Sequence, residues 1–133
     1  MTPLILVVED NSITALALVN VLRANGFRTV IASSAAGARD SLRTVHPDLI
    51  LLDVQLPGED GYELTRELKA NPATAAIPIV ITTARSLAID RTLAFEAGCD
   101  EFLTKPIQPG QLTPTLRRVL AAARPASTDG GAS

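Results

Sequence analysis

The chain has 133 residues, of which 47% are hydrophobic, and this length and composition are typical of one domain with a single packed core. A formal net charge of −2 argues against direct binding to nucleic acid or to an anionic membrane, because both need a basic surface. The single cysteine, Cys99, excludes an internal disulfide, and the N-terminus lacks the features of a secretory signal, so we expect a cytoplasmic protein.

Short apolar runs alternate with longer stretches of helical spacing along the chain, which is typical of repeated βα units. The first helix should take Ser12 as its cap and stop at Asn25-Gly26. In chain order, we expect a strand at Leu4–Val8, a helix from Ser12 to Asn25, a strand at Thr29–Ala32, a helix over Ala35 to Val45, strands at Leu49–Leu52, Ile77–Ile81 and Glu101–Thr104, and a helix over Leu112 to Ala123.

The first, third and fourth predicted strands are apolar at nearly every position rather than at alternate positions. Such strands are typical of a parallel sheet with helices on both faces. We therefore predict an α/β fold, a (βα)5 doubly wound five-stranded parallel sheet, over residues 1–123. Sites in this fold lie at the carboxyl ends of the strands. Residues 124–133 are mostly small and polar, and we interpret them as a disordered tail or a linker stub.

Four of the five predicted strands end in polar or charged residues, namely Glu9, Asp10, Asp53, Thr82, Thr83 and Lys105, the last of which is followed by Pro106. Carboxylates brought together repel one another unless a divalent cation and an ammonium group compensate their charge. Their oxygens suit Mg²⁺, which completes its coordination with water and phosphate oxygens. Asp53 can then act as a nucleophile toward phosphorus, while Lys105 and the metal neutralise the phosphoryl oxygens and Thr83 donates its hydroxyl to one of them.

Four segments together carry a family resemblance: residues 7–11 (VVEDN), 48–61 (DLILLDVQLPGEDG), 79–84 (IVITTA) and 96–106 (EAGCDEFLTKP). In this order they resemble the receiver domain of bacterial two-component response regulators, over residues 4 to about 123. The resemblance implies a CheY-like, flavodoxin-like fold of the single-domain type. It also implies a signalling switch, which assists its own phosphorylation and dephosphorylation but turns over no separate substrate.

The resemblance assigns a role to each residue of the acidic site. Asp53 would be the phospho-acceptor, and Asp10 the direct carboxylate ligand of Mg²⁺. Glu9, where many members carry Asp, would act on the metal through a water, and the backbone carbonyl of Gln55 would be a further ligand. Lys105 would contact the phosphoryl oxygens.

Further roles implied by the resemblance concern the lifetime and output of the signal. The side chains of Gln55 and Arg85 would tune the lifetime of the aspartyl phosphate. Thr83 and Phe102 would form the switch, in which Phe102 turns inward when Thr83 moves toward the phosphoryl group. The peptide bond before Pro106 would be cis.

The implied phosphoryl donor is the phosphohistidine of a sensor histidine kinase or of a histidine phosphotransfer protein, or more slowly acetyl phosphate. The donor protein would dock near the first helix and the Lys105 loop. Phosphorylation would change the affinity for a downstream protein effector through the fourth helix, fifth strand and fifth helix. The protein would be a monomer or a phosphorylation-dependent dimer.

Several alternatives remain open at this stage. The chain is either a complete regulator or a receiver cut from a longer protein with an output domain; the nearness of Met1 to the first strand favours a native N-terminus, while the tail could equally be a natural end or the start of a linker. A non-phosphorylated pseudo-receiver is a third possibility. A haloacid-dehalogenase-like phosphatase would need an aspartate at Gln55, and a nucleotide-binding module would need a glycine-rich loop after the first strand. We expect His46 to have no chemical role, and Tyr62 and Phe95 to serve packing.

Overall fold

The computed structural model describes residues 2–84 and 88–123, so Arg85 and the predicted tail lie outside the described residues. The elements in chain order are β1 (Leu4–Val8), α1 (Ser12–Ala24), β2 (Arg28–Ala32), α2 (Ala35–Ser41), β3 (Leu49–Asp53), β4 (Gln55–Leu56), β5 (Glu59–Asp60), α3 (Gly61–Ala70), β6 (Ile79–Thr83), α4 (Ala88–Ala97), β7 (Glu101–Thr104) and α5 (Pro109–Ala123). Within these ranges, no helix is long and apolar enough to cross a membrane.

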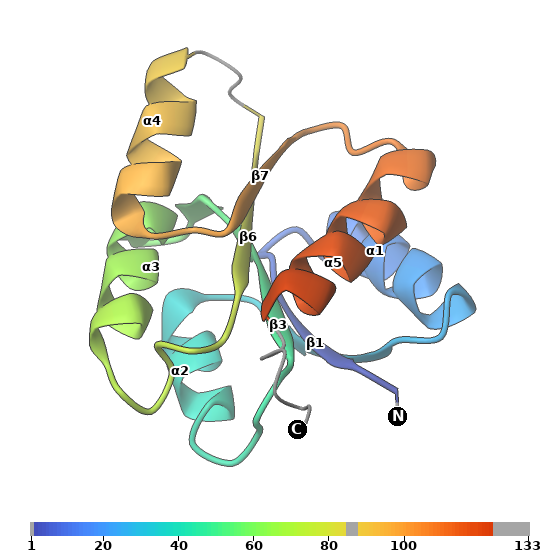
Figure 1. Cartoon of the computed structure of the whole chain (residues 1–133), viewed down its shortest axis with the longest axis horizontal. Coiled ribbons are helices and arrows are strands. Elements are labelled where there is room, and N and C mark those ends of the chain that lie inside the picture. The colour runs from blue at the N-terminus through green and yellow to red at the C-terminus, as the bar shows by residue number, and fades with distance from the viewer. Residues whose placement is uncertain (1, 85–87, 124–133) are drawn as a thin grey trace.

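Five strands form one parallel sheet in the order β2-β1-β3-β6-β7, which confirms the doubly wound fold predicted from the sequence. Helices α1 and α5 lie on one side of the sheet, and α2, α3 and α4 lie on the other (Figure 1). Strand β3 is buried at all five positions because alternate residues contact opposite layers. Ile50 and Leu52 belong to the core under α2, α3 and α4, whereas Leu49 and Leu51 belong to the core under α1 and α5.

Several boundaries differ from the sequence prediction, and three of the differences have a clear local cause. Asn11, not Ser12, caps α1, since its side-chain oxygen accepts a hydrogen bond from the Thr14 amide at 2.9 Å. Helix α2 ends at Ser41, where bonds of the i→i+3 type tighten the chain before it straightens toward Pro47. Strand β6 begins at Ile79, after Pro78, which cannot donate to the ladder.

The short antiparallel hairpin of β4 and β5 was not predicted, and it joins the end of β3 to the start of α3. Its turn carries Gly58 at a φ of 73°, a conformation that favours glycine. The hairpin pairs Gln55 with Asp60 and Leu56 with Glu59. It therefore fixes the backbone directly after Asp53, the residue at the centre of the predicted site.

The two aromatic residues predicted to serve packing behave differently. Tyr62 is buried, and its hydroxyl donates to the Asp90 carbonyl at 3.2 Å. Phe95 is 40% exposed, and its ring lies 5.2 Å from the Arg91 guanidinium carbon. Packing is therefore confirmed for Tyr62, while Phe95 is not a core residue because its position on α4 faces outward.

Cys99 is buried against the core under α2, α3 and α4. Burial raises the pKa of its thiol to about 12, and the charges of Asp100 and Glu101 act in the same direction. We expect the native protein to react slowly with a thiol-specific reagent at pH 8 and the urea-unfolded protein to react rapidly, as measured by absorbance of the released product. Equal rates in the two states would contradict the burial of this thiol.

Candidate functional site

The carboxyl ends of β1, β3 and β7 bring together acidic residues and one lysine. Glu9 and Asp10 follow β1, and Asp53 is the last residue of the neighbouring strand β3, whose Leu52 pairs with Val8. Carboxylate oxygens of these three acids lie within 4.8 Å of one another. Glu9 and Asp53 are 3% and 4% exposed, whereas Asp10 is exposed to solvent. The cluster is thus anchored in the sheet and open on the Asp10 side.

Lys105 bridges the two buried carboxylates. Its Nζ atom donates to Glu9 Oε1 at 2.8 Å and to Asp53 Oδ2 at 3.0 Å. The Lys105 amide donates to the Thr83 carbonyl at 2.7 Å, which ties the residue to the end of β6, and the Lys105–Pro106 peptide bond is cis. Strands β1, β3, β6 and β7 thus all contribute to the position of this ammonium group.

Backbone amides bind the remaining oxygens of the buried acids. The Asn11 amide donates to Glu9 Oε2 at 3.1 Å, and the Gln55 amide donates to Asp53 Oδ1 at 3.0 Å. Each buried carboxylate therefore has a hydrogen bond at both oxygens, one from Lys105 and one from the backbone. This arrangement orients the carboxylate plane of Asp53, because its two oxygens are held from different directions.

Burial and hydrogen bonding within the cluster shift the pKa values of Glu9 and Lys105. Burial raises the pKa of Glu9 above its usual value, because the hydrogen bonds from Lys105 and Asn11 only partly offset the loss of water. Burial by itself lowers the pKa of Lys105, but its hydrogen bonds to Glu9 and Asp53 outweigh this effect and leave the pKa raised. Lys105 is accordingly a firmly charged ammonium beside Asp53.

Gly61, the first residue of α3, lies directly against the backbone at the end of β3. Its amide donates to the Val54 carbonyl at 2.9 Å. A Cβ atom at this position would lie 2.6 Å from Val54 Cα and 2.8 Å from the Asp53 carbonyl oxygen. Only glycine allows α3 to approach so closely, and sequence reasoning missed this contribution, although Asp60-Gly61 before an amphipathic stretch is a recognisable helix start.

Thr83 and Phe102 lie on one face of the sheet. Ile81 pairs with Phe102, and both belong to the core under α2, α3 and α4. Thr83 lies two residues beyond Ile81, so the alternation of the strand directs it to the same side. Thr83 is fully buried, and Phe102 is 7% exposed with the Arg91 guanidinium carbon 5.9 Å from its ring centre.

Gln55 and His46, the remaining residues considered in the sequence analysis, lie at opposite ends of β3. Gln55 is exposed and lies two residues after Asp53, with its backbone amide on that carboxylate. His46 lies in the exposed loop before β3, at the opposite end of this strand from Asp53. The structure therefore brings Glu9, Asp10, Asp53, Gln55 and Lys105 to one end of the sheet.

The donor set of the site fits Mg²⁺. The available ligand atoms are carboxylate and carbonyl oxygens, and Asp10 leaves one side accessible to water or phosphate. Softer metals prefer sulfur or imidazole ligands, and among the described residues neither Cys99 nor His46 belongs to this cluster. The cluster resembles a receiver magnesium site in both its chemistry and its place in the fold.

Comparison with known proteins identifies the family. The family model of the response regulator receiver domain matches residues 5–117 of this chain. The chain is 38% identical over 113 residues to the DNA-binding response regulator MtrA of Mycolicibacterium paratuberculosis, covering 85% of this chain and 49% of that protein. The chain therefore belongs to the response regulator receiver domain family, whose members are signalling modules rather than turnover enzymes.

Solved structures agree with this assignment. A putative response regulator from Chloroflexus aurantiacus has a TM-score of 0.87 and 33% identity, covering 91% of this chain and 99% of that one. The receiver domain of the sensor histidine kinase PA1611 from Pseudomonas aeruginosa, with a magnesium ion coordinated in its active site cleft, has a TM-score of 0.83 and 33% identity, covering 91% of this chain and 99% of that one. The chain spans about half the length of the curated relatives that it matches.

Proposed function

We propose that the domain accepts a phosphoryl group on Asp53 from a phosphohistidine of a sensor histidine kinase or a histidine phosphotransfer protein, and that this modification changes its affinity for a protein effector. The observation that carries the proposal is the Asp53 carboxylate itself. It is buried at a strand end, held by the Gln55 amide and the Lys105 ammonium, and adjacent to the oxygens of Glu9 and Asp10.

The transfer step follows from this arrangement. An Asp53 carboxylate oxygen forms a bond to phosphorus as the bond from phosphorus to the imidazole nitrogen breaks, and the electron pair of that bond stays on the nitrogen. Lys105 stabilises the charge on the phosphoryl oxygens, and the Thr83 hydroxyl donates to one of them. The Glu9 carboxylate holds the Lys105 ammonium close to the acceptor throughout.

Asp10, Asp53 and the Gln55 carbonyl would hold Mg²⁺ directly, and Glu9 would hold it through a water. When bound, the metal supplies positive charge that offsets the phosphoryl oxygens. This role agrees with the exposed position of Asp10, which leaves the open side of the cluster to solvent and to the incoming phosphoryl group.

The proposed switch passes from Thr83 to Phe102, because both lie on the face of the sheet covered by α4. Thr83 moves toward the phosphoryl group, and Phe102 adjusts its packing beneath α4. The surface of α4, β7 and α5 then differs between the two states and binds the effector or a second copy of the domain. Gln55 and Arg85 set the rate at which water removes the phosphoryl group.

The donor protein docks beside the site, on α1 and the Lys105 loop. Ile13 on α1 is 80% exposed and Leu16 is 58% exposed, so the helix presents apolar side chains to solvent. An apolar groove between α1 and the loop is lined by Ile13, Ala17, Val21, Pro106, Ile107 and Leu112. Since exposed apolar patches of this kind favour protein binding, the groove supports docking close to Asp53. Such an exchange between protein partners takes place in the cytoplasm.

A second candidate is a receiver that belongs to a longer regulator with its own output domain. The observation that favours it is the length of relatives such as MtrA, of which this chain covers 49%. In that case the surface of α4, β7 and α5 contacts the output domain. The chemistry at Asp53 is the same in both cases.

The metal requirement tests the proposal. We expect acetyl phosphate to phosphorylate the protein in the presence of Mg²⁺ but not with EDTA, as followed by intact-protein mass spectrometry. Asp10→Asn should raise the Mg²⁺ concentration needed for half-maximal phosphorylation about tenfold or more, because it replaces a charged carboxylate ligand with a neutral amide. The control is Asp40→Asn, which changes an exposed acid on α2. Phosphorylation that proceeds equally with EDTA would contradict the proposed chemistry.

A further inference from the structure

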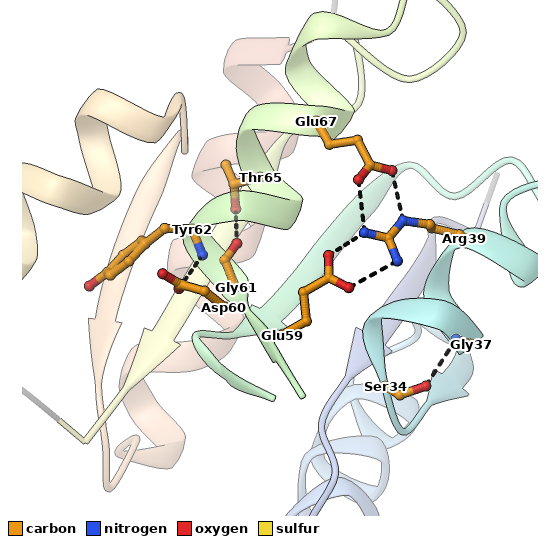
Figure 2. A network of polar contacts seen from close by, with 9 residues as sticks. All are labelled: Ser34, Gly37, Arg39, Glu59, Asp60, Gly61, Tyr62, Thr65 and Glu67. Atoms are coloured by element: carbon orange, nitrogen blue, oxygen red, sulfur yellow. Dashed lines mark hydrogen bonds and ion pairs between the residues drawn. The ribbon is translucent and has the colours of Figure 1, made fainter. Parts of the chain in front are cut away.

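Arg39 on α2 holds two glutamates that come from two other elements (Figure 2). Its Nε and Nη2 atoms donate to the two carboxylate oxygens of Glu67 on α3, at 2.7 and 2.8 Å. Its Nη1 atom donates to Glu59 Oε1 on β5 at 3.1 Å, and Nη2 also donates to Glu59 Oε2. One guanidinium therefore binds two carboxylates, each through both of its oxygens.

This arrangement is more than an ordinary surface ion pair. The side chains of Arg39, Glu59 and Glu67 are 35%, 30% and 48% exposed, so water screens them only in part. Hydrogen bonds from Arg39 lower the pKa of Glu67, which therefore stays ionised in mildly acidic solution. Single exposed pairs contribute little to stability, but bidentate pairs that share one arginine fix the geometry of the elements that they join.

The Arg39 network is connected to the acceptor through the β4–β5 hairpin. Glu59 pairs with Leu56, and the next pair along the hairpin is Asp60 with Gln55. The Gln55 amide in turn donates to Asp53 Oδ1 at 3.0 Å. With two residues in each strand, the hairpin is too short to be stable by itself and depends on contacts from outside.

We propose that Arg39 is a positioning residue for the acceptor site: by holding Glu59 against α2, it fixes the β4–β5 hairpin and with it the Gln55 backbone, which binds Asp53 and provides a metal ligand. Arg39 touches neither the phosphoryl donor nor the reacting atoms. The inference rests on the proposed function only for the role of the Gln55 carbonyl as a ligand; the effect on the hairpin does not depend on it.

The first test measures the hairpin in the metal-free protein. Amide hydrogen exchange by NMR should become about tenfold faster at Gln55 and Leu56 in Arg39→Gln and in Glu59→Gln, because the hairpin opens locally. At Gln55 and Leu56 the exchange rates of the double variant should resemble those of either single variant, since both single variants remove the contact between Arg39 and Glu59. The matched control is Arg66→Gln, which removes the exposed pair of Arg66 with Glu63 within α3 but leaves the hairpin untouched.

The second test measures Mg²⁺ binding by isothermal titration calorimetry. Removing a group that orients a metal ligand typically weakens binding by about tenfold or more, so we expect this change in Arg39→Gln but not in Arg66→Gln. If Arg39→Gln and Arg66→Gln gave the same exchange rates at Gln55 and the same Mg²⁺ affinity, the positioning role would be wrong. Faster exchange in Arg39→Gln supports that role even if Asp53 proves not to be phosphorylated, so the two proposals fail separately.

Discussion

Replacing Gly61 with alanine should lower the free energy of unfolding by about 3 kcal/mol, because the added methyl group has no space. Its Cβ atom would lie 2.6 Å from Val54 Cα and 2.8 Å from the Asp53 carbonyl oxygen, and both are backbone atoms that cannot rotate away. Relief requires α3 to move from the sheet or the end of β3 to shift. Urea unfolding followed by circular dichroism measures the loss.

The control for this substitution is Gly110→Ala in α5. Nothing lies within 4 Å of a Cβ atom at Gly110, so alanine adds no clash there. Alanine in a helix is more favourable than glycine, and we expect the free energy of unfolding to stay the same or rise by about 0.5 kcal/mol. Similar losses of stability in Gly61→Ala and Gly110→Ala would contradict the close approach of α3 to the end of β3.

Replacing Lys105 with alanine should slow phosphoryl transfer to Asp53 by about 10²-fold, the usual cost of losing one group that stabilises charge in the transition state. The variant also leaves the buried carboxylates of Glu9 and Asp53 without their shared ammonium. Their repulsion then disfavours the arrival of further negative charge. The rate with acetyl phosphate and saturating Mg²⁺, followed by intact-protein mass spectrometry, measures the effect.

Lys69→Ala is a matched control, because the Lys69 and Lys105 side chains are 21% and 22% exposed and both form ion pairs. Lys69 Nζ donates to Asp100 Oδ2 at 3.0 Å and to the Ile77 carbonyl at 2.9 Å, away from the acidic cluster. We expect Lys69→Ala to lower stability but to leave the rate of transfer unchanged. If both lysine variants slowed transfer equally, the effect would be one of general stability and not of charge at the site.

The fold and the acidic cluster were predictable because each depends on a local signal. Apolar runs such as Leu4–Val8 predict strands buried on both faces, and the parallel arrangement then brings their carboxyl ends together. Glu9 and Lys105 are 96 positions apart in sequence, but each directly follows a strand. The order of the strands in the parallel sheet was therefore enough to predict that both side chains lie near Asp53. The four motifs of the receiver family, in their order along the chain, then indicated phosphoryl transfer to Asp53 as the chemistry of this cluster.

The parts that were missed depend on packing between elements. Pro57-Gly58 is a turn signal, but strands of two residues show no periodicity, and the hairpin was therefore not predicted. The contacts of Arg39 with Glu59 and Glu67 span 20 and 28 positions, and nothing local in the sequence pairs these charges.

The solvent exposure of individual side chains was equally hard to predict from the sequence. Phe95 and Phe102 are the same residue type, but one is 40% exposed and the other 7%, because strand β7 enters the core while this face of α4 does not. Their different environments follow from tertiary packing and not from any difference in the residues themselves.

The location of the phosphoryl group tests the central claim most directly. After incubation with acetyl phosphate and Mg²⁺, intact-protein mass spectrometry should detect one phosphoryl adduct, and peptide mapping should place it on Asp53. The adduct should be absent in Asp53→Asn, which keeps the size of the side chain but removes the nucleophilic carboxylate. An adduct that persists in Asp53→Asn, or that maps to another residue of the wild-type protein, would contradict the assignment of Asp53 as the acceptor.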